Sequence, residues 1–200
     1  MADKTEFTIG TRARCSDGPV GKVIRIVIDL TTRTVTHLAV ELKHQYGPAR
    51  LVPLDLVDTT GSEIRLHCTL AEFGDLDTAE EYQIVDDIGT ADLGPADLAA
   101  PQALIPTVVV PVDDVVPPGE TELQGGEYVQ AIDGEIGQVR GVIIDRGDRR
   151  VTHVLLKEGH LWGRKEVAIP ASAITDVTDG IVLNLTRKQV EDLPAYETLG

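Results

Sequence analysis

The chain has few aromatic residues, few cysteines and no long apolar run, and each shortage excludes a class of protein. Aromatics make up 4% of the 200 residues although 42% are hydrophobic, so aliphatic side chains must fill the interior. Val and Ile, which dominate here, favour strands. Cys15 and Cys68 are too few for a disulfide framework. No apolar stretch reaches the roughly 20 residues of a membrane helix, and no secretory signal is visible. We therefore expect a cytoplasmic protein rich in strands.

The chain is also poor in positive charge. It has 18 Lys and Arg residues against 33 Asp and Glu residues, which gives a formal net charge of −15 and a pI of about 4.6. Nucleic-acid binding depends on Lys and Arg side chains that neutralise phosphates. This composition therefore argues against direct binding to nucleic acid, while binding to a basic protein stays open.

The middle of the chain has no Lys or Arg at all. Residues 87–125 contain seven acidic residues, and six of the eleven prolines lie between Pro95 and Pro118. Proline prevents a long helix and favours extended or polyproline conformations. This combination of charge and proline is typical of a linker between two domains.

The two halves of the chain repeat one another. Shifting the sequence by 116 residues aligns SDGPVGKVIRIVID with IDGEIGQVRGVIID, and RTVTHLAV with RRVTHVLL. After an insertion of one residue the shift becomes 117, and twenty-two identities accumulate across residues 5–80. An internal duplication of this kind means that one structural unit is built twice.

Each repeat has the pattern of a small all-β unit. Runs rich in Val and Ile, such as VIRIVID and VRGVIID, alternate with turn segments that contain Asp-Gly. Each repeat ends with a capping-box pattern, Thr-x-x-Glu at residues 69–72 and Thr-x-x-Gln at residues 186–189. Short strands followed by one helical turn predict a barrel, in which closure removes exposed edges. The predicted fold class is mainly β, with two tandem small β-barrels, each closed by a short helix.

These patterns also predict where the domains begin and end. We expect a first barrel at residues 1–86, a Pro-rich acidic linker at residues 87–120 and a second barrel at residues 121–200. The linker ends in a run of valines, and burial of a valine contributes roughly 1.5 kcal/mol or more. We therefore expect residues 106–116 to pack in extended form along a barrel or in the cleft between the two barrels.

Several motifs together resemble one known family. They are DGPVGKVIRIVID, VTHLAV and LVPLDLV in the first repeat, and DGEIGQVRGVIID, VTHVLL and VAIPASAI in the second. These resemble the PRC-barrel domain of the photosynthetic reaction-centre H subunit and of the ribosome maturation factor RimM. The resemblance implies a small barrel that contacts partners, with no catalytic residue and no cofactor. The membrane helix of the H subunit and the other domain of RimM have no counterpart here, so neither function carries over intact.

The duplicated histidines are the first candidates for chemistry. His37 and His153 occupy equivalent places, and each is followed seven residues later by a second histidine, His44 or His160. A metal site or a proton shuttle would use such residues. No third ligand recurs in both repeats, because His67 and Cys68 are replaced by other residues in the second. We therefore interpret the histidines as structural and expect no bound metal.

The cysteines and the aspartates of the turns have simpler interpretations. Cys15 and Cys68 align with Ala131 and Leu185, which indicates core cysteines that behave as small apolar side chains. The recurring aspartates precede glycines or end strands, where a carboxylate accepts hydrogen bonds from backbone amides. They are Asp17, Asp29, Asp133 and Asp145. We expect turn formation from them and no acid–base catalysis.

The stretch EGHLWGRKE, residues 158–166, is the most distinctive surface candidate. It lies at the end of a basic island, because residues 140–165 contain seven Lys or Arg residues and three Asp or Glu residues. Trp and Arg are favoured at interface hot spots. The predicted partner-binding residues are His160, Trp162, Arg164 and Lys165, with Tyr46 as the counterpart of Trp162 in the first repeat. Two alternatives stay open: the rings cap their barrels, or the basic side chains hold the acidic linker.

The sequence leads to one main functional hypothesis. We expect a non-enzymatic adaptor or assembly module that acts through protein–protein contacts of its two barrels. A second hypothesis is a ribosome- or RNA-maturation-associated factor similar to RimM, and a weaker one is an accessory of a photosynthetic or membrane complex. The identity of the partner is open, and so is the formation of a homo-oligomer.

Overall fold

A computed structural model shows the fold of the chain. It describes residues 4–43, 48–58, 63–85, 108–114, 116–158, 165–177 and 180–196. The chain divides into two units, one made of residues 1–79 together with 116–200, and the other of residues 80–115. Both sequence repeats therefore belong to the first unit.

The first barrel is a seven-stranded sheet. Its strands from the first repeat are β2 (Arg12–Arg14), β3 (Pro19–Asp29), β4 (Thr34–Leu42), β5 (Arg50–Pro53), β6 (Val57–Asp58) and β7 (Ile64–Leu66). They lie in the order β5-β4-β3-β2-β7-β6, in which β2 and β7 are parallel and the other neighbours antiparallel. A 3-10 turn, η1 (Leu54–Leu56), follows β5, and the helix α1 (Leu70–Gly74) follows β7.

The second barrel repeats this arrangement element by element. Its strands from the second repeat are β11 (Tyr128–Ala131), β12 (Gly134–Asp145), β13 (Val151–Glu158), β14 (Glu166–Pro170), β15 (Ile174–Asp176) and β16 (Ile181–Leu183). Their order is β14-β13-β12-β11-β16-β15, and η2 (Ala171–Ala173) and α2 (Arg187–Glu191) follow β14 and β16. The predicted fold class, mainly β with two tandem small barrels, is confirmed.

Both closing helices begin with the predicted capping box. The hydroxyl of Thr69 accepts a hydrogen bond from the Glu72 amide, and the Glu72 carboxylate accepts one from the Thr69 amide. Thr186 and Gln189 make the same reciprocal pair at α2. These bonds satisfy two backbone donors that a helix start leaves without partners.

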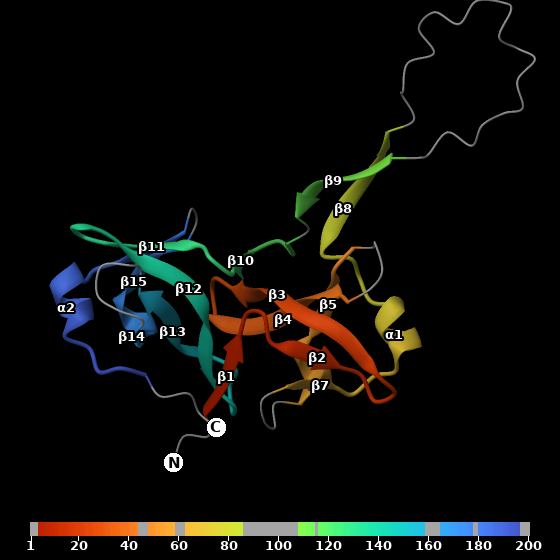
Figure 1. Cartoon of the computed structure of the whole chain (residues 1–200), viewed down its shortest axis with the longest axis horizontal. Coiled ribbons are helices and arrows are strands. Elements are labelled where there is room, and N and C mark those ends of the chain that lie inside the picture. The colour runs from red at the N-terminus through yellow and green to blue at the C-terminus, as the bar shows by residue number, and fades with distance from the viewer. Residues whose placement is uncertain are drawn as a thin grey trace, which may run out of the picture. The chain divides into compact units, whose positions relative to one another are not determined.

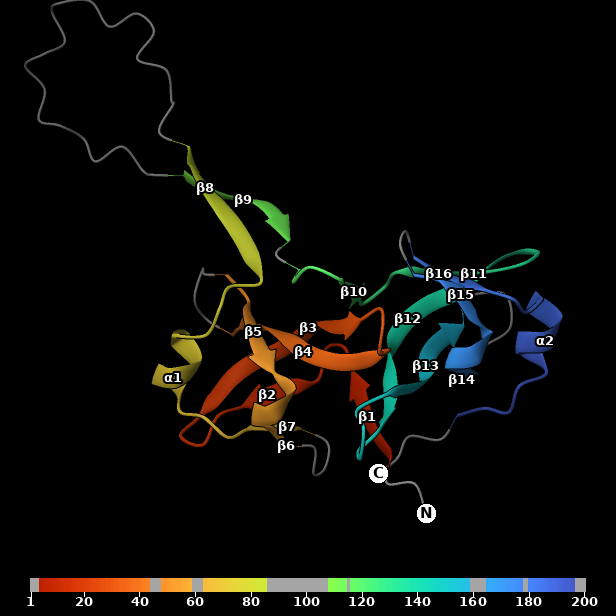
Figure 2. The same cartoon turned by 180° about the vertical axis from the view of Figure 1, so that it is seen from behind.

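The seventh strand of each barrel comes from the other repeat. Strand β1 (Lys4–Thr8) pairs antiparallel with β12, in a register that sets Phe7 opposite Val142. Strand β10 (Glu120–Gln124) pairs in the equivalent register with β3 and sets Leu123 opposite Ile26. Figure 1 and Figure 2 both show β1 along β12 and β10 along β3. The two repeats have therefore exchanged their first strands.

The crossover between the barrels takes place at two consecutive residues. The amide of Ile9 donates to the carbonyl of Arg140 in the second barrel, and the amide of Gly10 donates to the carbonyl of Val23 in the first. Gly10 has a φ of 91°, a conformation that a side chain would strain. Gly126, its equivalent, has a φ of 89° and bonds the carbonyl of Val139. One glycine in each repeat thus lets the chain leave one barrel and enter the other.

The exchanged strands bury large side chains in a core that runs through both barrels. Phe7 and Leu123 are each 2% exposed and belong to the same cluster of buried residues. Because each lies in the barrel of the other repeat, burial of its apolar surface stabilises both the barrel and the connection between barrels. Neither barrel is complete without a strand of its neighbour.

A second contact joins the hairpins between β3 and β4 and between β12 and β13. The amide of Val35 donates to the carbonyl of Arg149, and the amide of Val151 donates to the carbonyl of Arg33. Arg33 and Arg149 have φ values of 57° and 60°, so both hairpins turn through the same left-handed conformation. This reciprocal pair of bonds shows that the two repeats face each other through equivalent segments.

The second unit is a two-stranded hairpin. Strand β8 (Glu80–Val85) pairs antiparallel with β9 (Val108–Asp114), and Pro111 lies opposite Tyr82. The valine run of the predicted linker is therefore extended, as expected, and is hydrogen-bonded to the segment that follows the first repeat. Residues 87–107 lie outside the described residues. The packing of the valine run against a barrel stays a prediction.

Candidate interaction surface

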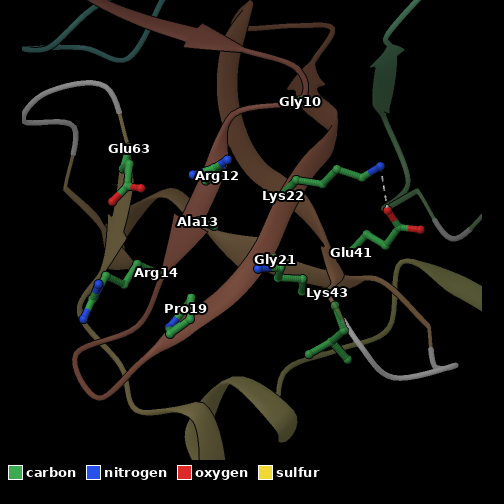
Figure 3. Close-up of a pocket in the computed structure, with 11 residues that line it drawn as sticks. Gly10, Arg12, Ala13, Arg14, Pro19, Gly21, Lys22, Glu41, Lys43 and Glu63 are labelled. Carbon is green, nitrogen blue, oxygen red and sulfur yellow. Dashed lines mark ion pairs between the residues drawn. The ribbon is translucent and has the colours of Figure 1, made fainter.

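The outer face of the first barrel has a row of charged side chains across three strands. Arg12 of β2 lies directly opposite Lys22 of β3, and Lys22 lies opposite Glu41 of β4. The ammonium of Lys22 forms an ion pair of 3.1 Å with Glu41, and both side chains are about half exposed. The row borders a groove of about 490 Å³, whose lining side chains Figure 3 shows. Two positive side chains thus share the middle of this face.

A second row of the same kind lies beside the first. Arg14 of β2 lies opposite Arg65 of β7, and Arg65 lies opposite Asp58 of β6. Arg14 and Glu63 line both the first groove and an adjoining one of about 470 Å³. Each row therefore contains two positive side chains and one negative side chain. Both positive pairs include an arginine of β2, and the negative side chains lie at the outer ends of the rows. We call the face formed by Arg12, Arg14, Lys22 and Arg65 the basic face.

The equivalent face of the second barrel has a different chemistry. Tyr128 lies opposite Gln138, which lies opposite Lys157, so the first row holds a single charge. In the second row Gln130 lies opposite Val182, and Val182 lies opposite Asp176, so this row also holds a single charge, of the opposite sign. Tyr128 is 56% exposed and Val182 is 37% exposed. One backbone therefore presents a basic face in the first barrel and a neutral, partly apolar face in the second.

The duplicated histidines lie at equivalent places and face opposite charges. Nδ1 of His37 lies 3.8 Å from the Glu120 carboxylate, beyond hydrogen-bond distance, and that carboxylate accepts a bond of 2.9 Å from the Thr36 hydroxyl. His153 has the Thr152 hydroxyl 3.1 Å from its Nδ1. Burial, together with the positive charge of Lys4, lowers the pKa of His153. Their companions His44 and His160 lie outside the described residues.

Metal ligation finds no support in the part of the chain that the structure describes. Among those residues, no group of three or more His, Cys, Asp or Glu side chains could hold a metal ion. His37 and His153 each lie beside a threonine and one charged side chain of an exchanged strand. The expectation that no metal binds stays a prediction.

The cysteines lie in the core of the first barrel, as predicted. Their Sγ atoms are 3.8 Å apart, and both side chains are buried and unoxidised. Burial, aided by the neighbouring sulfur of Cys68, raises the pKa of Cys15 to about 12. The thiolate, which is the nucleophilic form, is therefore strongly disfavoured at neutral pH.

The recurring aspartates form two kinds of backbone contact. Asp29 accepts hydrogen bonds from the amides of Thr31 and Thr32, which lower its pKa, and Asp145 accepts one from Gly147. These are the turn contacts that the sequence predicted. Asp17 and Asp133 do something else: each accepts a bond from the first amide of the distant closing helix, at Leu70 and at Arg187. They tie the β2–β3 and β11–β12 turns to α1 and α2.

Four of the five predicted partner-binding residues lie outside the described residues. These are His160, Trp162, Arg164 and Tyr46. The fifth, Lys165, donates hydrogen bonds from its ammonium to the carbonyls of Glu191 and Leu193. Its charge therefore stabilises the end of α2, where the carbonyls of a helix lack partners.

The predicted basic island makes ion pairs with its own surroundings. Arg140 forms an ion pair of 3.0 Å with Glu166, and Arg149 pairs with Asp55 of the first repeat. The residues of the basic face were not among the sequence candidates. They could have been found by asking where the aligned repeats differ in charge, because Arg12, Arg14 and Arg65 align with Tyr128, Gln130 and Val182.

Comparison with known proteins identifies the second repeat. Residues 126–190 match the family model of the PRC-barrel domain, so the chain contains a PRC-barrel domain in this region. The resemblance inferred from the motifs is confirmed there, and the first barrel has the same strand order. No curated protein matches the chain. Among the described helices, none has the length and apolarity required to cross a bilayer.

Proposed function

We propose that this chain is a non-enzymatic assembly module that holds two differently surfaced barrels in one unit and contacts protein partners through them. The observation that carries the proposal is the reciprocal exchange of β1 and β10. The exchange makes each barrel depend on the other, so both outer faces are presented together. PRC-barrel domains are generally non-catalytic, which supports a role in binding.

The chemistry of the side chains favours binding as well. The cysteines are buried, and burial raises the pKa of Cys15. His37 and His153 each lie beside a hydroxyl group or one charged side chain, and Asp17 and Asp133 accept hydrogen bonds from backbone amides. The diverged outer faces are, by contrast, exposed. Duplicated units that keep their core and change one face are suited to contact different partners.

The experiment is purification of the tagged full-length chain from native lysate, followed by gel filtration and mass spectrometry. We expect a partner protein that stays bound in constant ratio through washing at moderate salt. Elution of the chain at its own mass from both untreated and cross-linked lysate would contradict the proposal. Sedimentation with ribosomal subunits in a sucrose gradient would favour the alternative role in ribosome or RNA maturation.

The residues predicted from the sequence remain part of this proposal. The residues proposed to contribute to a partner surface are His160, Trp162, Arg164, Lys165 and Tyr46. The variant Trp162→Ala tests this proposal, and the measurement is whether the partner complex still forms. Loss of the partner with an unchanged circular dichroism spectrum would support a contact, whereas loss of folded structure would assign the ring to the barrel.

A further inference from the structure

The basic face of the first barrel has an arrangement that does not favour folding. Arg12 lies directly opposite Lys22 in the antiparallel pair, and Arg14 lies opposite Arg65 in the parallel one. Like charges at directly opposite positions destabilise a sheet, because their side chains lie about 5 Å apart on one face. The second barrel has the same strands with Tyr128 opposite Gln138, so the fold does not require these charges.

The four cations are also placed where a ligand can reach them. Arg12, Arg14 and Arg65 are exposed, and the Lys22 side chain is 57% exposed. They border two adjoining grooves of about 490 and 470 Å³ that share Arg14 and Glu63. Figure 3 shows Lys22 reaching toward Glu41 while Arg12 and Arg14 project from β2. The positive charges follow the length of β2, so the site suits an extended chain.

We propose that the basic face binds an extended acidic segment of a partner protein. This inference rests on the proposed function and names the chemistry of its partner. Carboxylates at alternate positions of an extended peptide lie about 7 Å apart, which is the spacing of Arg12 and Arg14 along β2. Arg pairs with carboxylates through two parallel hydrogen bonds. A bound acidic segment would relieve the repulsion within both like-charge pairs.

An acidic peptide fits this face better than a nucleic acid does. The rows end in Glu41 and Asp58, and Glu63 lines both grooves, so negative side chains border the positive strip. A nucleic acid requires many phosphate contacts over a continuous positive surface. A nucleic acid would extend beyond the positive strip onto the surface of a chain with a net charge of −15, whereas a short segment meets mainly the charges within a Debye length of about 8–10 Å.

Fluorescence anisotropy with a labelled decaglutamate peptide tests the proposal. The probes for comparison are a labelled neutral Gly/Gln peptide of equal length and a labelled single-stranded oligonucleotide of about 20 bases. The variant Arg12→Tyr/Arg14→Gln has the residues of the second barrel at both positions. The matched control Arg146→Gln/Arg150→Gln removes the same charge from the exposed β12–β13 hairpin.

We expect decaglutamate to bind the native chain, the neutral peptide not to bind, and the first variant to weaken binding at least tenfold. The control should weaken it less than threefold. The thermal midpoint of the first variant should equal or exceed that of the native chain, since repulsion is removed. A lower midpoint would assign the arginines a structural role and overturn the proposal.

Two further outcomes would also overturn the proposal: equal weakening by both variants, and tighter binding of the oligonucleotide than of decaglutamate. The proposed function fails separately. If a native partner stays bound to Arg12→Tyr/Arg14→Gln, the assembly role stands and the basic face is not its site. If no partner is found for the native chain, the assembly role itself is contradicted.

Discussion

The two barrels have one backbone and two sets of local electrostatics. In the first, Arg25 of β3 is 5% exposed, and its guanidinium forms an ion pair of 3.1 Å with Glu122 on the exchanged strand β10. In the second, Gly141 takes the place of Arg25. A Cβ at Gly141 would lie 2.1 Å from the Phe7 carbonyl oxygen, so β1 packs directly against the backbone of β12. At the equivalent place in the first barrel, β10 contacts the buried Arg25. The same exchange is therefore secured by charge in one barrel and by close packing in the other.

The histidines continue this contrast. His37 faces Glu120 and His153 faces Lys4, and both charged residues lie on exchanged strands at equivalent positions. The outer faces differ in the same way, because basic side chains in the first barrel align with neutral or apolar ones in the second. After duplication, the core kept its shape, while the charges around the exchanged strands and on one outer face diverged. The comparison teaches that the fold tolerates either chemistry at these positions.

The largest expected effect comes from removing Phe7, the large buried side chain of the exchanged strand β1. Phe7→Ala should lower the free energy of unfolding by about 4 kcal/mol, because it removes a fully buried ring from the core. Since Phe7 lies in the second barrel, hydrogen exchange should increase at β12 and β13 more than at β3 and β4. Urea unfolding and amide exchange measure both results.

Leu123→Ala is the matched variant for the other barrel. It should increase exchange mainly at β3 and β4, at a cost of about 3 kcal/mol. If Phe7→Ala instead loosened the barrel of its own repeat, the strand exchange would be wrong.

The next effect compares Glu122 of β10 with Glu6, which occupies the equivalent position in β1. Glu122→Gln should destabilise the fold by about 2 kcal/mol, because the buried Arg25 loses its carboxylate partner. Glu6, the equivalent of Glu122, accepts bonds from the hydroxyls of Thr8 and Tyr196, and a glutamine oxygen can accept them as well. Glu6→Gln should therefore cost less than about 1 kcal/mol in the same urea titration. Equal losses would show that the ion pair contributes nothing particular to the first barrel.

A smaller effect concerns the two cysteines, which the second barrel replaces with Ala131 and Leu185. The double variant Cys15→Ala/Cys68→Leu should change the free energy of unfolding by about 1 kcal/mol, since the volume removed at residue 15 offsets part of the volume added at residue 68. In the native chain both thiols should react slowly with a disulfide reagent at pH 7.5, and quickly after unfolding. Rapid labelling of the folded chain would contradict the burial of the pair and the raised pKa of Cys15.

The smallest expected effect is a pH dependence that comes from His153 in the second barrel. The pKa of His153 is lowered in the folded chain, so the unfolded chain takes up the proton first as the pH falls below about 6.5. The contribution of His153 to stability is therefore present above that pH and lost as the pH falls through its folded pKa. The effect is small because the ring is partly exposed and solvent screens it. NMR titration of the ring protons measures it.

Lys4→Glu sharpens this last test, because it gives His153 the acidic neighbour that His37 has. The pKa of His153 should rise in this variant, and the loss of stability at low pH should shrink. Lys188→Glu, on the exposed side of α2, serves as the control with the same change in charge. An unchanged titration of His153 in Lys4→Glu would show that Lys4 does not act on the ring.

Much of the architecture follows from local sequence signals. The duplication at residues 5–80 is visible when the chain is aligned with itself. The capping boxes at Thr69 and Thr186 and the turn at Asp29 are formed by residues close in sequence. Such signals depend on hydrogen bonds between neighbours along the chain, so they are visible before any tertiary structure is known. The roles of Asp17 and Asp133 at the closing helices were missed, because each joins residues more than fifty positions apart.

The sequence by itself determined that this protein is two copies of one β unit with an acidic, Pro-rich segment between them. Only the tertiary structure decided which barrel each first strand joins. Strands β1 and β10 could make equivalent backbone hydrogen bonds in either barrel. The two repeats also share their pattern of apolar residues, so this pattern does not show which barrel each strand joins. Several residues have their roles only when the two repeats are assembled. These are the crossover residues Gly10 and Gly126, Gly141 with its close approach to β1, and the ion pair of Arg25 with Glu122. The basic face likewise required the structure, because Arg14 and Arg65 become neighbours only when β2 pairs with β7.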